Sequence, residues 1–417
     1  MRALALLVSK SLREHSLSSW VTVLSIGLGC GLTMAVYVVT AQAKEAFTQG
    51  DVGFDAVLGA RGSALQLVLN TVFHLETSPG NIPYQLYEDV AADPRVALAI
   101  PYAVGDNYRN YRIVGTTEEF FTDFELRSGK QFEPRPGSRF FHPLHPEAVI
   151  GSVVADQTGM KVGSTFSPYH GVEFDESARH EEEYTVVGIL EPTNTPSDRV
   201  IWIPIEGIFR MGGHVLRGAG ENYRAQQGEE IPDEHKEVSA VMLKFADPKV
   251  GFQLDQLINK QGKVATLAWP IGTSLAELFR KLGWITLVLE LIAILVVVVA
   301  AGTILASITN TMRERRKEFA ILRALGARRS TVFAAILAES TTLATLGAIV
   351  GFGIYAGIVL AAASMVRVET GVVLTLAHFH IALVAVPVGV MILGALAGII
   401  PARSAYATDV ATHLAGQ

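Results

Sequence analysis

Residues 311–330, TMRERRKEFAILRALGARRS, form a short basic segment between two long apolar runs. The first run covers residues 282–310 and the second starts at residue 331. Between residues 313 and 329 the segment has seven basic and two acidic side chains, a net charge of +5 in a chain whose net charge is −6. Because lysine and arginine near the ends of a membrane span resist translocation, we expect this segment on the cytoplasmic side of a membrane.

The spacing inside this segment predicts a short amphipathic helix. Phe319, Leu322 and Leu325 recur every three residues, which gives a helix one apolar stripe and a basic back. Gly326 suits the residue just past a helix end, where a left-handed backbone is easiest for glycine. Such a helix could lie on anionic lipid headgroups or dock into a groove of a cytoplasmic protein. The physical pattern does not choose between these two.

The apolar residues are clustered rather than dispersed, and half of the chain is hydrophobic. Runs long enough to cross about 30 Å of hydrocarbon are expected at residues 20–42, 282–310, 331–366 and 379–400. The third run is too long for a simple crossing, so it should tilt or extend into the cytoplasm. The alternative for the first run is a cleaved signal peptide, but its apolar part is too long for one.

With four spans, both ends of the chain are expected in the cytoplasm. Residues 1–19 read as an amphipathic helix along the membrane interface, and residues 401–417 as a short tail. Residues 43–281 contain no run long enough to span, so they should form one domain on the far side of the membrane. Residues 44–281 carry a net charge of −11, which argues against nucleic acid as a partner.

Strand and helix patterns in this domain predict a two-lobed α+β fold, with an insert at about residues 132–235. The chain has one cysteine, Cys30, so the domain must be stable without an internal disulfide. Strands are expected at residues 51–58, 96–103, 111–115, 148–150, 184–190, 200–205, 238–245 and 264–267, and helices at residues 83–92 and 247–259.

Residues 318–340, EFAILRALGARRSTVFAAILAES, closely resemble the segment between the second and third spans of FtsX-like ABC transporter permeases. The order of short motifs in the far-side domain, such as Val114-Gly115, Asp198 and Ile203-Pro204, resembles that of macrolide-exporter and lipoprotein-release permeases. In that family the basic segment is the coupling helix that sits on a separate ATPase. The resemblance therefore implies these ATPase-coupling residues: Arg315, Lys317, Glu318, Phe319, Leu322, Arg323 and Gly326.

The chain contains no Walker A sequence, so we expect no ATP hydrolysis and no cofactor in this chain. The resemblance implies that ATP and Mg²⁺ are bound by the partner ATPase. The expected function is the permease subunit of a mechanotransmission ABC system in a bacterial inner membrane. A homodimer, or a pair with a similar permease, would sit on two ATPase copies and be surrounded by membrane lipid. It would act on a lipoprotein, peptide or efflux substrate. A periplasmic lipoprotein or adaptor would be a further partner.

Two other classes of function are alternatives to this hypothesis. A membrane-anchored extracytoplasmic sensor or binding module, responding to metal through its histidines, would need a cytoplasmic output domain, for which residues 401–417 are too short. His142, His145, His170 and His180 are the candidate zinc ligands, but their spacing matches no tight ligand motif, so no metal site is assigned. An anchored hydrolase is the other class, and the sequence contains no recognisable catalytic constellation for it.

Small residues four apart in the spans should allow helix backbones to approach closely, within one chain or in a dimer. The glycines concerned are Gly27, Gly31, Gly347, Gly351, Gly353, Gly357, Gly394 and Gly398. The carboxylates of Glu290 and Glu339 lie in the spans and are interpreted as groups near the membrane boundary. Helix formers beyond the first span and before the second predict a stalk beneath the domain, with Phe47, Leu275, Leu278 and Phe279 at its contact.

Overall fold

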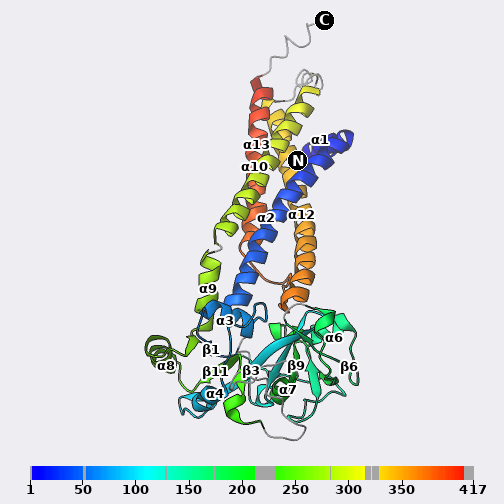
Figure 1. The fold of residues 1–417 in the computed structure, drawn as a ribbon. Coiled ribbons are helices and arrows are strands. Elements are labelled where there is room, and N and C mark those ends of the chain that lie inside the picture. The colour runs from blue at the N-terminus through cyan, green and yellow to red at the C-terminus, as the bar shows by residue number, and fades with distance from the viewer. Residues whose placement is uncertain are drawn as a thin grey trace. The chain divides into compact units, whose positions relative to one another are not determined.

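The computed structural model in Figure 1 describes residues 2–49, 53–126, 129–171, 174–211, 231–281, 283–314, 321 and 328–407. The chain divides into two compact units. The helical unit comprises residues 1–43, 282–363 and 374–417, and the α/β unit comprises residues 44–281 and 364–373. Each unit is described by itself below.

The helices of the first unit match the expected spans. Four described helices contain segments long and apolar enough to cross a membrane: Ser16–Ala46, Gly283–Arg313, Ser330–Thr370 and Ala382–Arg403. They belong to α2 (Ser16–Gln49), α10 (Gly283–Glu314), α12 (Arg329–Thr370) and α13 (Ala382–Ala407), and α1 (Arg2–Glu14) precedes them. Helix α12 is longer than expected, because residues 367–370, which lie beyond the predicted run, are helical.

Glycines bring α2 and α12 together at backbone distance. A Cβ added at Gly31 would lie 2.7 Å from the Gly351 carbonyl oxygen, and one at Gly347 would lie 2.4 Å from the Ile26 side chain. Gly27 likewise faces Val350 at 2.8 Å. Since a side chain larger than hydrogen has no room at these positions, the two helices form one closely packed pair.

The other glycines divide into two groups. A Cβ at Gly394 would meet Ala344 at 2.5 Å, and one at Gly398 would meet Ser340, so α13 packs on α12 through both. Around Gly353 and Gly357, no described atom lies within 4 Å of an added Cβ. These two glycines therefore do not serve packing within the described part of the chain. A contact between copies of the chain remains a proposal for them.

The carboxylate of Glu339 has a partner on the first helix. The Ser11 hydroxyl donates to Glu339 Oε1 at 2.8 Å, and the Ser11 side chain is buried. Helix α1 is thereby attached to α12, which agrees with a structural role for this carboxylate. Glu290 is half-buried on α10.

The α/β unit is built on a mixed sheet, ten-stranded in the described residues, with the order β12-β1-β11-β3-β4-β9-β5-β8-β6 and β7 beside β3. The strands are β1 (Ala56–Ala60), β3 (Val96–Tyr108), β4 (Tyr111–Thr116), β5 (Glu147–Ile150), β6 (Thr165–Phe166), β7 (Tyr169–His170), β8 (Tyr184–Ile189), β9 (Ile201–Pro204), β11 (Ala240–Phe245) and β12 (Ala265–Ala268). A separate pair joins β2 (Ile82–Pro83) to β10 (Glu237–Val238).

Short helices cover this sheet. They are α3 (Ala64–Thr71), α4 (Tyr84–Ala91), α5 (Glu119–Thr122), α6 (Ser152–Thr158), α7 (Ile205–Arg210), α8 (Val250–Asp255) and α9 (Ile271–Lys281). The chain also forms 3₁₀ turns at Glu176–Ala178, Pro196–Arg199 and Asp233–His235, and a π-helix at Gln256–Gln261.

Strand β3 joins the two halves of the sheet. Its first part pairs with β11, and its second part pairs with β4 and β7. The register shifts between Val104 and Asp106, as in a β-bulge, which re-aims the side chains that follow. The mixed α+β class is confirmed, and the strands of the insert extend the same sheet because β9 pairs with β4 in parallel.

The elements differ from the sequence prediction where the local signals were weak. Helix α3 was missed, although Ser63 caps it by accepting from the Gln66 amide at 3.3 Å. The helix expected at residues 247–259 is α8 followed by the π-helix. Residues 51 and 52 of the first expected strand lie outside the described residues, and β1 starts at Ala56.

Candidate functional site: the end of helix α12 and an aromatic cavity

A rigid turn at residues 193–199 receives the end of α12, and we call it the α12 socket. The buried carboxylate of Asp198 holds the turn, because Asp198 Oδ1 accepts from the Thr193 amide at 2.9 Å and Oδ2 accepts from the Asn194 amide at 2.8 Å. The Thr193 hydroxyl adds a third bond, 2.8 Å to Oδ1. Burial raises the pKa of Asp198, and these hydrogen bonds oppose that rise.

Residues 367–373, at the carboxyl end of α12, contact this socket directly. The Arg199 guanidinium donates to the carbonyl oxygen of Glu369. Gly371 has a left-handed backbone with φ of 75°, and a Cβ added there would lie 2.5 Å from the Thr195 carbonyl oxygen. Glycine is therefore required at this position both for its conformation and for its close approach. Residues 367–373 therefore pack closely within the α/β unit, to which they belong.

Charged groups surround the same joint. Arg367 lies 3.8 Å from Asp156, and Arg135 lies 3.7 Å from the other oxygen of that carboxylate. The Arg199 guanidinium also lies over the Tyr111 ring, 5.7 Å from its centroid. Burial lowers the pKa of Arg199, and the nearby Glu369 partly restores it. The cation is thus held in a partly buried position between the domain and the helix end.

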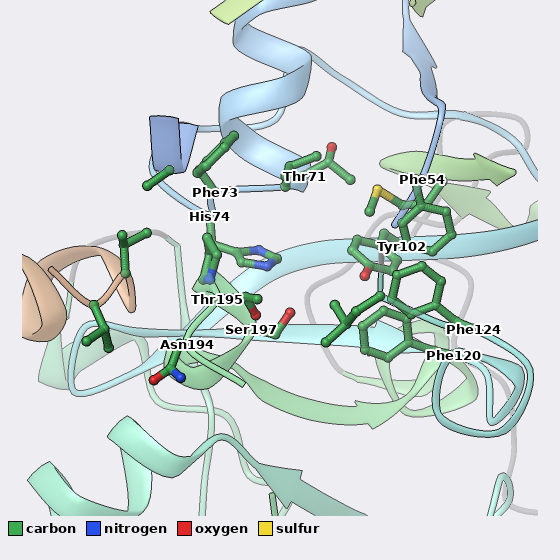
Figure 2. Close-up of a pocket in the computed structure, with 17 residues that line it drawn as sticks. Phe54, Thr71, Phe73, His74, Tyr102, Phe120, Phe124, Asn194, Thr195 and Ser197 are labelled. Atoms are coloured by element: carbon green, nitrogen blue, oxygen red, sulfur yellow. The ribbon is translucent and has the colours of Figure 1, made fainter. Parts of the chain in front are cut away.

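A cavity of about 140 Å³ lies beside the socket (Figure 2). Its walls come from the end of α2, the residues after α12, the socket and the aromatic core. The lining residues are Ala46, Phe54, Thr71, Val72, Phe73, His74, Tyr102, Phe120, Phe124, Leu126, Asn194, Thr195, Pro196, Ser197, Met242, Val372 and Val373. An apolar cavity of about 150 Å³ accepts a molecule the size of benzene, whereas pockets for whole drug-sized ligands have about 300–1,000 Å³. This cavity fits one ring or a short aliphatic group.

His74 is the unusual residue of this cavity. Its backbone is left-handed, with φ of 55°, which is uncommon for a residue other than glycine. Figure 2 shows its ring extending toward Tyr102, and their centroids are 6.5 Å apart. Burial, followed by the charges of Arg112 and Arg199, lowers the pKa of His74 to about 3. The imidazole is therefore neutral at physiological pH, with one nitrogen that can donate a hydrogen bond to a polar group in the cavity and one that can accept.

Two protein-family models match this chain. The FtsX-like permease C-terminal family matches residues 290–410, and the MacB-like periplasmic core domain matches residues 19–258, more than half of the chain. The chain belongs to the MacB/FtsX-like ABC permease family. The predicted family and fold class are thereby confirmed, as are the four apolar helices with a MacB-like periplasmic domain inserted after the first.

Two of the solved structures similar to this permease are extracytoplasmic regions of transporters. The periplasmic region of MacB from Actinobacillus actinomycetemcomitans is 9% identical, with a TM-score of 0.34, and the match covers 55% of this chain and 94% of that one. The extracellular domain of the noncanonic ABC-type transporter YknZ from Gram-positive bacteria is 12% identical, with a TM-score of 0.29, covering 51% of this chain and 97% of that one.

Only some of the predicted site residues of the permease lie in the described part of the chain. The ATPase-coupling residues Arg315, Lys317, Glu318, Phe319, Leu322, Arg323 and Gly326 lie outside the described residues. Leu275 of the predicted stalk is buried in the core of the α/β unit near α3, while Leu278 and Phe279 are half-buried. Residue 282, between α9 and α10, lies outside the described residues, as does the side chain of Phe47, so the stalk contact stays a prediction.

Sequence reasoning missed the socket, because its parts are more than 150 residues apart in the chain. Arg199 and Glu369 are separated by 170 residues, and neither stands in a recognisable motif. The available signals were Asp198, which belongs to the family-like order, and Gly371, which follows a helix of 42 residues. His74 carried no sequence signal.

Proposed function

We propose that this permease transmits force from a separate ABC ATPase to its periplasmic domain, and that α12 carries the force. The observation that carries the proposal is the single helix Arg329–Thr370. It starts next to the basic segment and ends in contact with the socket through Gly371 and the Glu369 carbonyl. An unbroken helix transmits a displacement along its axis, which a flexible linker does not.

The packing of α2 supports this route. Gly27 and Gly31 hold α2 against Gly347 and Gly351, so a movement of α12 would take α2 with it. The far end of α2 lines the same cavity as residues 372 and 373, through Ala46. Force arriving through both helices would therefore reach one place in the domain, the socket and its cavity.

The ATPase would engage the basic segment at residues 313–329, which we propose is cytoplasmic because of its net charge of +5. Both ends of the chain would then be cytoplasmic and the α/β unit periplasmic. Two copies of the permease would act with two ATPase subunits, as the family resemblance implies. ATP and Mg²⁺ would be bound by those subunits.

The substrate is proposed to be a lipoprotein, a peptide or an efflux substrate that is moved outside the membrane. The cavity of about 140 Å³ is too small for such a substrate as a whole and could accept one ring or a short aliphatic group of it. The work would therefore be done by movement of the domain rather than by passage through this cavity.

The test uses the full permease in lipid nanodiscs with the ABC ATPase that co-purifies with it. Leu322→Asp places a charge on the predicted apolar stripe of the coupling segment, and Ser330→Asp places the same charge outside that stripe. We expect Leu322→Asp to abolish the stimulation of ATP hydrolysis by the permease and Ser330→Asp to retain it. If Leu322→Asp binds the ATPase and stimulates it as the wild type does, the segment is a lipid-surface helix and the proposed coupling is wrong.

A further inference from the structure

A second cluster, which shares no residue with the socket, joins one carboxylate and two imidazoles. Asp106 lies on β3, His170 lies opposite it on β7, and His180 follows the 3₁₀ turn Glu176–Ala178. One ligand atom from each residue lies within 4.8 Å of those of the other two. From the sequence, His170 and His180 were candidate metal ligands together with His142 and His145. Asp106 was not among the candidates, because it lies 64 residues before His170 in the chain.

The backbone fixes the positions of all three side chains. Directly opposed residues on paired strands have their side chains on the same face of the sheet, and Asp106 is opposite His170. The Gly171 amide donates to the Gly105 carbonyl oxygen at 2.7 Å, and the His180 amide donates to the Pro168 carbonyl oxygen at 2.9 Å. The cluster is therefore arranged by main-chain hydrogen bonds before any ligand arrives.

The distances from Asp106 Oδ1 fit a metal site, and the contact with His180 also has the length of a hydrogen bond. Asp106 Oδ1 lies 3.1 Å from His180 Nε2 and 3.4 Å from His170 Nδ1. In a tetrahedral zinc site with bonds of about 2.0–2.2 Å, neighbouring ligand atoms are about 3.3–3.5 Å apart. The 3.4 Å separation exceeds the usual range of about 2.7–3.2 Å for an N–H···O bond.

The three side chains differ in their exposure to solvent. The side chain of Asp106 is fully buried, that of His180 is 8% exposed and that of His170 is 55% exposed. A buried carboxylate is costly unless a cation or hydrogen-bond donors compensate its charge. The exposed imidazole leaves one side of the cluster open to solvent, so an ion could enter and exchange there.

We propose that Asp106, His170 and His180 bind one divalent transition-metal ion, with Zn²⁺ as the favoured ion. Two imidazoles and a carboxylate suit zinc and neighbouring metals, whereas Ca²⁺ and Mg²⁺ prefer oxygen ligands alone. Three protein ligands and an open fourth position are typical of an exchangeable site rather than a closed structural one. The bound ion would fasten β7 and the residues around His180 to the central strand β3.

The experiment uses the full permease in nanodiscs, purified without a histidine tag, stripped with a chelator and then dialysed. Zn²⁺ binding is measured by calorimetry, and Co²⁺ binding by its visible absorption. We expect about one ion per chain in the wild type and no competition from Ca²⁺ or Mg²⁺. Loss of an outer-sphere partner of a metal costs about 10–100-fold in affinity, so His180→Ala, which removes a ligand, should weaken binding at least tenfold.

Two further variants make the result decisive. His170→Ala changes a side chain that is 55% exposed, so the domain should remain folded while binding weakens at least tenfold. The control is His142→Ala with His145→Ala, a stacked and exposed pair with ring centroids 4.3 Å apart, which should bind as the wild type does. Metal should also slow hydrogen exchange at the Gly171 and His180 amides. The proposal is overturned if the wild type binds no ion, or if His170→Ala binds as tightly as the wild type.

Discussion

Replacing Gly371 by alanine should loosen the end of α12 from the socket. The left-handed backbone at this position costs an alanine about 1–2 kcal/mol. The added Cβ would also lie 2.5 Å from the Thr195 carbonyl oxygen, so the socket must move, and such overpacking costs about 1–3 kcal/mol more. Gly129→Ala is the matched control, because Gly129 has the same φ of 75° and no described atom within 4 Å of its added Cβ.

The assay is hydrogen exchange in the full permease, followed by mass spectrometry. The two costs together, about 2–5 kcal/mol confined to the joint, correspond to roughly 30–5,000-fold more frequent opening of the amides at residues 193–199 and 367–373. Gly129→Ala should leave exchange at these amides as in the wild type. Equal exchange in the two variants would refute the close fit of Gly371 against Thr195.

Three further predictions test other parts of the account. As the pH falls from 7.5 to 5, His74 should lower the free energy of unfolding of the domain by about 2 kcal/mol. The reason is that the imidazole of the unfolded chain takes up a proton below pH 6.5, whereas that of the folded chain, with a pKa of about 3, does not. His74→Gln should remove this part of the pH dependence of the thermal midpoint. In a chain whose native cysteine is replaced, a cysteine at Ser177 should react with an impermeant thiol reagent in intact cells and one at Ser330 should not, and the reverse result would invert the topology. Gly347→Ala should lower the thermal midpoint of the purified permease, because its Cβ would meet Ile26 at 2.4 Å, whereas Gly353→Ala should not; equal midpoints would contradict the close packing of α2 and α12.

The sequence predicted those parts of the fold that local patterns determine. Long apolar runs indicated the four spans, and spacing of four indicated glycines such as Gly31 and Gly351, which do approach closely. Alternating strands gave the α+β class but not the sheet order, because pairings such as β1 with β12 join residues about 200 positions apart.

The candidate site was less accessible to sequence reasoning. The socket and the Asp106 cluster each depend on long-range pairings, because Arg199 meets Glu369 and Asp106 meets His170 only in the folded chain. Leu275 was predicted to pack against Phe47 because its helix is amphipathic. The structure places Leu275 in the domain core, and the side chain of Phe47 lies outside the described residues, so the predicted contact stays a prediction. An amphipathic pattern indicates that a face is covered, but it does not say what covers it.

The central claim is that ATP binding to the partner ATPase acts on the cytoplasmic segment and changes the socket through α12. Hydrogen exchange at residues 193–199 in the complex of permease and ATPase, with and without a non-hydrolysable ATP analogue, tests it most directly. We expect the analogue to change exchange at these residues in the wild type, and Leu322→Asp to abolish that change while the complex still forms. Exchange at the socket that is the same with and without the analogue in the wild-type complex would contradict the claim.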